Sequence, residues 1–133
     1  MDVETAIVAH LRAVPLIESL SGGRVVPAGS SSVLRPNIVY QRLTTKREYS
    51  NDGPTHAPWA TVQIGCWADT LSVARQLSDA VIAALDGFTG EVNGFQIDAV
   101  FITDENSAPE SAAPGKEEGI KGILVDCVVH YQE

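Results

Sequence analysis

PWATVQIGCWADTLSVARQLSDAVIAALDG, residues 58–87, is the stretch that decides the fold of this chain. In its first half, successive residues alternate between an apolar face and a second face. Val62, Ile64 and Cys66 share one face and the residues between them lie on the other, which is the period of two of a half-buried strand. The period then changes, because apolar residues recur at spacings of three and four from 74 to 85, as in an amphipathic helix. The stretch therefore predicts a strand that runs directly into a helix, without any catalytic motif.

Capping residues mark the ends of this helix and of an earlier one. Asp69 or Thr70 can accept hydrogen bonds from the first amide groups of the helix, and Gly87 can adopt the left-handed conformation that ends it. Near the N-terminus, apolar residues at spacings of four, four and three predict a first helix over 3–14, with Asp2 as its cap. The chain therefore contains at least two amphipathic helices.

The region between these helices predicts a long hairpin. Pro15 either kinks the first helix or starts a further short turn, and residues 24–27 form a short extended piece. Residues 37–47 are rich in β-branched and aromatic side chains, which favour a strand. The sequence SNDGP, residues 50–54, consists of residues that favour a turn, and it precedes the strand over 59–68.

Two further strands are predicted after the second helix. A turn at 91–94 precedes residues 95–101, where every second residue is apolar and alternates with polar ones. The last strand covers 120–131, where every second residue from Ile123 onward lies on one apolar face. The segment 104–119 between them is small, acidic and proline-rich, and predicts a flexible hairpin loop.

The order of elements predicts the fold class. A helix, two main strands, a second helix and two more main strands describe an α+β protein. The economical arrangement is one mostly antiparallel sheet of about four main strands, formed as long hairpins, with the two helices packed on one face. Residues 1–133 form a single domain in this interpretation, with the flexible acidic loop at 104–119.

Composition narrows the classes of function. The 133 residues include nine basic and seventeen acidic ones, for a net charge of −8, and the one basic cluster is Arg42, Lys46 and Arg47. Nucleic-acid binding needs clustered cations that replace the counterions of the phosphates, so direct DNA or RNA binding is not expected. No apolar run approaches the length that crosses a bilayer. Cys66 and Cys127 lie on apolar strand patterns and are interpreted as small buried residues of a reduced protein, with a disulfide as the alternative.

No catalytic, cofactor or metal site is predicted. The glycine-rich stretches lack the Gly-Lys-Ser/Thr of a phosphate-binding loop, and no Gly-x-Ser-x-Gly motif occurs. His10, His56 and His130 do not stand at metal-ligand spacings. Asp98 and Asp126 could face each other across neighbouring strands as an acid and base, or they could belong to a solvated sheet face.

Two tryptophans give the strongest indication of function that the residues themselves provide. Trp59 and Trp67 both fall on the strand face opposite Val62 and Ile64. An aromatic pair on an outward sheet face indicates a surface that binds a partner, because interface cores are enriched in Trp and Tyr. Cover by loops of the same chain is the alternative. Either interpretation points away from catalysis.

With these elements in order, the chain resembles the tail-completion family of long-tailed phages, which includes the tail terminators. The resemblance covers nearly the whole length. It rests on LSGGRV at 20–25, RPNIVY at 35–40, VQIGCWA at 62–68 and the helix ARQLSDAVIAAL at 74–85. The acidic segment 104–119 is longer than the usual turn of the family at that place.

The resemblance implies a structural role in virion assembly. Such a protein forms a ring of six copies that caps the tail tube at its head-proximal end, ends tube growth and helps to join tail and head. Its partners would be other copies of itself, the major tail tube protein and a neck or head-completion protein, with no membrane and no cofactor. DNA would pass through the ring without specific binding. The protein would be located in the virion, and in the host cytoplasm during assembly.

The candidate interface residues combine the tryptophans with the polar loops 48–57 and 104–119, which we expect to become ordered against neighbours or the tube. They are Trp59, Trp67, Arg47, Tyr49, Asp52, Glu105, Glu117 and Glu118. One alternative is another neck component, such as a head-completion or stopper protein. The other is a small enzyme or ligand-binding domain, which would gather the histidines and carboxylates in one pocket.

Overall fold

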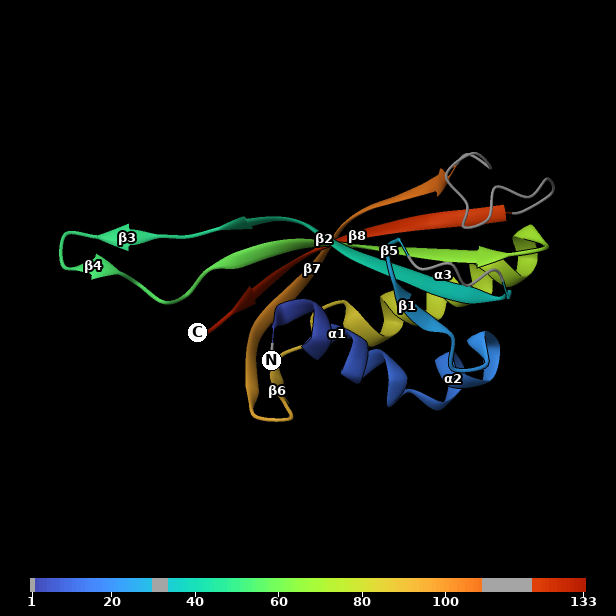
Figure 1. Ribbon diagram of the computed structural model, residues 1–133, viewed down its shortest axis with the longest axis horizontal. Coiled ribbons are helices and arrows are strands. Elements are labelled where there is room, and N and C mark those ends of the chain that lie inside the picture. The colour runs from blue at the N-terminus through green and yellow to red at the C-terminus, as the bar shows by residue number, and fades with distance from the viewer. Residues whose placement is uncertain (1, 30–33, 109–120) are drawn as a thin grey trace.

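The structure, a computed structural model, describes residues 2–29, 34–108 and 121–133 (Figure 1). Its helices are α1 (Val3–Arg12), α2 (Pro15–Ser21) and α3 (Leu71–Leu85). Its strands are β1 (Val25–Pro27), β2 (Asn37–Lys46), β3 (Tyr49–Ser50), β4 (Gly53–Pro54), β5 (Trp59–Ala68), β6 (Gly90–Val92), β7 (Phe95–Ala108) and β8 (Lys121–Tyr131).

The main sheet is mixed and has six strands, in the order β1-β2-β5-β8-β7-β6. It is curled, β1 runs parallel to β2, and the other neighbouring strands are antiparallel. The three helices of the described ranges lie together on one side of it (Figure 1). The predicted α+β fold with a four-stranded, mostly antiparallel sheet and two helices is therefore wrong in strand number, sheet type and helix number.

The additional elements are short, which explains why the sequence pattern indicates no more than an extended piece at 24–27 and a short turn after Pro15, and no strand at 90–92. β1 and β6 have three residues each, too few for a period to be recognised. Pro15 starts the separate helix α2, because its fixed φ suits a first helical position where no amide partner is needed. Gly22, at φ 65°, ends α2 in the left-handed region.

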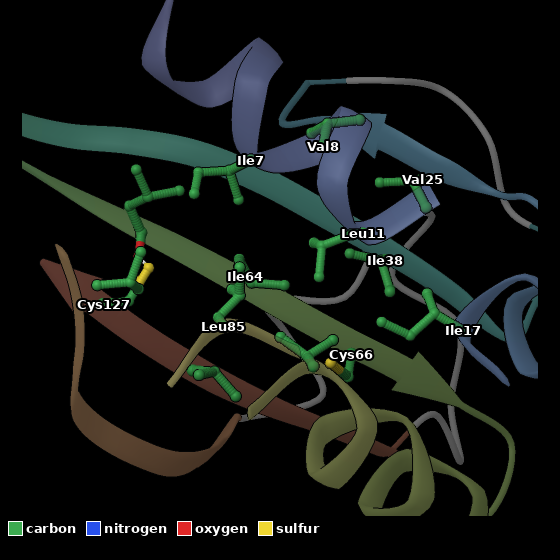
Figure 2. Close-up of a cluster of buried hydrophobic side chains, with 14 of the residues drawn as sticks. Ile7, Val8, Leu11, Ile17, Val25, Ile38, Ile64, Cys66, Leu85 and Cys127 are labelled. Atoms are coloured by element: carbon green, nitrogen blue, oxygen red, sulfur yellow. Dashed lines mark hydrogen bonds between the residues drawn. The ribbon is translucent and has the colours of Figure 1, made fainter. Parts of the chain in front are cut away.

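The predicted core faces pack between the helices and the sheet. Ile7 and Leu11 of α1 and Ile17 of α2 are fully buried. They lie over inward-facing residues of β2 and β5 such as Ile38 and Ile64 (Figure 2). The apolar face of β8, from Ile123 to Tyr131, is buried at every second residue, as its pattern predicts. This single core fixes the sheet, and with it the opposite face.

Both predicted helix caps are present. The Asp2 carboxylate accepts a hydrogen bond from the Thr5 amide at 3.0 Å, and this bond lowers the pKa of Asp2. Thr70, not Asp69, caps α3, because its hydroxyl accepts from the Val73 amide at 3.3 Å. Asp69 instead pairs with Arg35 at 2.8 Å.

Two bulges in β7 change the predicted alternation of this strand. The register passes from Ile97 opposite Tyr131 to Ala99 opposite His130, so Asp98 is an extra residue. Ile97 is fully buried, whereas Phe101, predicted on the same face, lies on the opposite side of the sheet and is 54% exposed.

The second bulge, at Thr103, precedes a strand that continues further than the pattern indicates. Residues 104–108, which the sequence analysis places in the flexible loop, pair with β8. The rest of that predicted loop, 109–119, lies outside the described residues, as does residue 120, the predicted start of the last strand.

Candidate interaction surfaces

Aromatic side chains gather on the face of the sheet that carries none of the described helices. Trp59 of β5 stacks on His130 of β8, with ring centroids 5.6 Å apart and planes inclined by 25°. Phe101 of β7 stands edge-on to the same His130 at 5.7 Å. We call Trp59, Phe101, Val128 and His130 the outer surface. It spans three neighbouring strands and leaves Phe101 more than half exposed.

Trp67 lies on this face of the sheet too, but it is buried. It is 3% exposed and packs with Val39 and Leu124. Its ring lies against Gly65 and Gly122, where a Cβ on Gly122 would stand 2.4 Å from two ring carbons. Within this chain Trp67 is therefore a packed part of the fold, covered by residues of neighbouring strands and not by the loops that the sequence interpretation named.

Polar side chains form a row beside the outer surface. Asp104 of β7 stands directly opposite Asp126 of β8, and Gln63 is the next residue across. The Asp126 Oδ1 atom is buried and has no hydrogen-bond partner among the described residues. Asp98, proposed from sequence as the partner of Asp126, is the bulged residue and accepts from Gln132 at 3.1 Å. Asp126 thus faces Asp104 and not Asp98.

The hairpin between β2 and β5 continues beyond the rest of the molecule as an extended arm, residues 47–58 (Figure 1). Its far end is the two-residue pair of β3 and β4, closed by the predicted turn. Within it, the Asp52 amide donates to the Ser50 hydroxyl at 3.2 Å. Tyr49 is 70% exposed. The arm carries three of the predicted interface residues, Arg47, Tyr49 and Asp52.

Residues 131–133 bind the base of the arm through an ion pair and backbone hydrogen bonds. Arg47 forms an ion pair with Glu133. The Glu133 amide donates to the His56 carbonyl at 3.0 Å, and the Tyr131 amide donates to the Pro58 carbonyl at 3.2 Å. A cleft of about 290 Å³ lies here, lined by Arg47, Glu48, Tyr49, Pro54, His56, Ala57, Pro58 and Glu133.

The three histidines lie in three separate places. The His10 Nε2 atom donates a hydrogen bond to the Ala84 carbonyl at 2.9 Å and the ring packs against Phe88, which makes His10 part of the helix packing. His56 lines the arm cleft, and His130 belongs to the outer surface. In the described ranges no three His, Cys, Asp or Glu side chains are grouped so as to hold a metal ion. Nor is any helix there long and apolar enough to cross a membrane.

Both cysteines are buried free thiols, as their strand positions predict. Burial raises the pKa of Cys66, and raises that of Cys127 to about 12. The Cys127 thiol donates to the Val62 carbonyl at 3.5 Å. A nucleophilic or metal-binding cysteine needs a thiolate near neutral pH, and these environments oppose it.

Of the remaining predicted interface residues, the structure describes one, Glu105. Glu105 lies on β7, where its carboxylate is 3.4 Å from the Ser78 hydroxyl of α3. Glu117 and Glu118 lie outside the described residues. Sequence reasoning missed Phe101 and Asp104, which the bulges bring to the outer face, whereas His130 could have been recognised from its position opposite the buried face of β8.

Comparisons with known proteins agree with the elements described above. The family model of tail completion protein gp17 matches residues 5–114. Among solved structures, a chain from the virion of a native gene transfer agent particle has the same fold, with a TM-score of 0.79. It is 15% identical, and the alignment covers 98% of this chain and 95% of that one. The comparison with curated proteins found no match.

The family match spans most of the domain, including most of α1, the arm hairpin and α3. This chain therefore belongs to the tail completion protein gp17 family and is a structural protein of a phage tail.

Proposed function

We propose that this protein is a tail terminator: a ring of six copies that caps the head-proximal end of the tail tube, stops its growth and offers a docking face to the head. The observation that carries the proposal is the family match over residues 5–114. The full-length likeness to a chain of a gene transfer agent virion supports it, since the aligned chains are of nearly the same extent.

The surfaces of the molecule are of the kind that a ring requires. A closed ring is built from a heterologous interface, in which two different patches of the same chain meet. The arm and the outer surface are two such patches, and they differ in shape and composition. Contacts with other copies, the tail tube protein and a neck protein are proposed for Arg47, Tyr49, Asp52, Trp59, Glu105, Glu117 and Glu118, whereas Trp67 is buried within its own chain.

The charge of the chain suits a protein that surrounds a DNA channel. With a net charge of −8, a ring of six copies repels phosphates more than it attracts them. DNA would then pass through without being held. This part of the proposal predicts that the purified protein does not retard DNA in a gel at physiological salt.

Deletion of the gene in the phage or prophage that carries it tests the proposal. An uncapped tube end keeps presenting the surface that recruits the next tube subunit. We therefore expect filled heads, separate tails and tubes of variable length in electron micrographs. Complementation in trans with the intact gene should restore joined particles with tubes of uniform length.

Two other outcomes would point elsewhere. Separate heads and tails with tubes of uniform length would indicate a neck component that acts after termination, such as a head-completion or stopper protein. Normal, joined particles in the deletion strain would contradict both assignments.

A further inference from the structure

We propose that the arm of one copy docks on the outer surface of the next copy in the ring, with Tyr49 against Phe101 and His130, and with Lys46 beside Asp104 and Asp126. This inference rests on the proposed function, because it assumes that copies of the chain meet at the tail end. It identifies the donor and acceptor surfaces of that contact.

The arm buries almost nothing within its own chain. Every residue from Arg47 to Ala57 is exposed except Gly53, which is half-buried. A hairpin with two-residue strands is marginally stable in water unless it packs against something else. The backbone pairing of β3 with β4 and the ion pair between Arg47 and Glu133 hold the arm in a defined direction. An ordered element that buries so little of itself is explained by a partner.

The geometry excludes the chain's own outer surface as that partner. The arm continues β2 and β5 away from the body of the molecule (Figure 1). Six residues per strand at about 3.3 Å each give a reach of about 20 Å. A domain of this length has a radius of gyration of about 14 Å, so the arm can extend across more than half of a neighbour.

The outer surface offers the matching apolar area. Phe101 is 54% exposed beside His130 and Trp59, which are half-buried. Tyr49, at 70% exposure, is the large aromatic residue of the arm. Aromatic rings pair favourably edge-to-face or offset, and such residues dominate the energetics of interfaces. The exposed apolar residues on the helical side, Leu16 and Leu71, lie on different helices with no aromatic cluster described beside them.

Charge complementarity also favours a second copy as the occupant. Lys46 and Arg75 are the cations of the described ranges for which the structure gives no ion pair or side-chain hydrogen bond. Asp104 and Asp126 stand directly opposite each other, and like charges in that position destabilise a sheet. The ammonium of Lys46, the β2 residue that precedes the arm, would relieve this repulsion if it came from the adjacent copy. The two carboxylates beside the outer surface thus offer a negatively charged partner to the Lys46 ammonium.

Directed cross-linking in assembled tails tests the contact. Because Cys66 and Cys127 are buried, introduced cysteines can be linked selectively with a short bis-maleimide. The variant Asn51→Cys with Ala99→Cys places one thiol at the arm tip and one beside the outer surface. The control variant Asn51→Cys with Ser72→Cys moves the second thiol to the exposed start of α3. We expect a ladder of multimers of this chain from the first variant and none from the control.

Several results would overturn the inference. A ladder from the control variant would move the acceptor to the helical side, and a product between Asn51→Cys and the tail tube protein would make the tube the occupant. Absence of any product from protein that is present at the tail end would reject the arm contact and leave the terminator role intact. Absence of the protein from purified tails would reject both the arm contact and the terminator role.

A charge exchange provides an independent test. Lys46→Glu and Asp104→Lys should each lower the fraction of tails that carry the protein, by about tenfold for a lost contact of 1.4 kcal/mol. The double variant should recover most of this loss, because it restores opposite charges across the contact. Arg75→Glu, the matched control, should leave incorporation unchanged. A double variant no better than either single variant would contradict a contact between Lys46 and Asp104.

Discussion

Phe101 stands edge-on to His130, with ring centroids 5.7 Å apart, on the side of the sheet opposite to the fully buried Val100. This relationship exists because the bulge at Asp98 shifts the strand by one residue. Without the extra residue, Phe101 would share the inward face of Ile97, which its sequence pattern predicts. The bulge thus creates an exposed aromatic group where a buried one is expected.

Substitution of these two adjacent residues should separate assembly from stability. Val100→Ala should lower the free energy of unfolding by about 2 kcal/mol, because it opens a cavity in the core. Phe101→Ala removes a side chain that is mostly exposed, so it should change stability by less than about 1 kcal/mol. Urea unfolding measures both. Equal losses of stability would show that Phe101 faces the core and that the bulge is absent.

Trp67 should contribute to folding through its contact with glycine. Gly122→Ala places a methyl group in the volume of the Trp67 ring and should cost about 1–3 kcal/mol by overpacking. In the double variant with Trp67→Leu, the effect of the alanine should largely disappear. Thermal or urea unfolding of the unaltered protein, the two single variants and the double variant measures this interaction as a double-mutant cycle. Additive effects would mean that the ring does not lie against Gly122.

The buried thiols predict a loss of stability at alkaline pH. Burial raises the pKa of Cys127 from 9.0 to about 12, so the folded protein keeps a proton that the unfolded chain loses. The contribution of this thiol is complete below pH 9. It declines by about 1.4 kcal/mol per pH unit as the pH rises from 9 toward 12. Urea unfolding of Cys127→Ala between pH 7 and pH 10.5 should show a shallower decline than the unaltered protein; parallel curves would contradict the burial of this thiol.

The ion pair between Arg47 and Glu133 should affect the arm more than the fold. Both side chains are partly exposed and screened by water, so Glu133→Gln should have little effect on the free energy of unfolding. Hydrogen exchange should become faster over residues 47–58, because the variant loosens the base of the arm. Glu4→Gln, which breaks the similar pair with Arg42, is the matched control and should leave the arm unchanged. Unaltered exchange in both variants would show that the backbone hydrogen bonds alone fasten the arm.

The elements with a strong period could be predicted from the sequence. The strand over 59–68, the helix that follows it and the cap at Asp2 are present as their patterns indicate. The extended piece at 24–27 is present as β1, but its parallel pairing with β2 and the whole of β6 could not be predicted, because a three-residue strand carries no readable period and depends on the neighbour that it pairs with. For this reason the predicted sheet has too few strands and lacks the parallel pair.

The candidate surface could be predicted only in part. Trp59 and the turn of the arm hairpin follow from the residues, since an aromatic group on a polar strand face and a Gly-Pro turn are local features. The place of Phe101 and Asp104 depends on bulges, which tertiary packing sets and no local pattern reveals. The burial of Trp67 depends on glycines in two different strands, which meet only in the folded sheet.

Electron cryo-microscopy of tails purified from mature particles tests the terminator assignment most directly. We expect a ring of six copies at the head-proximal end of the tube and nowhere else, with density that accommodates the curled sheet and the three helices of the described ranges. Each arm should lie across the neighbouring copy. A tube end that lacks this chain, or copies of it distributed along the tube, would contradict the assignment.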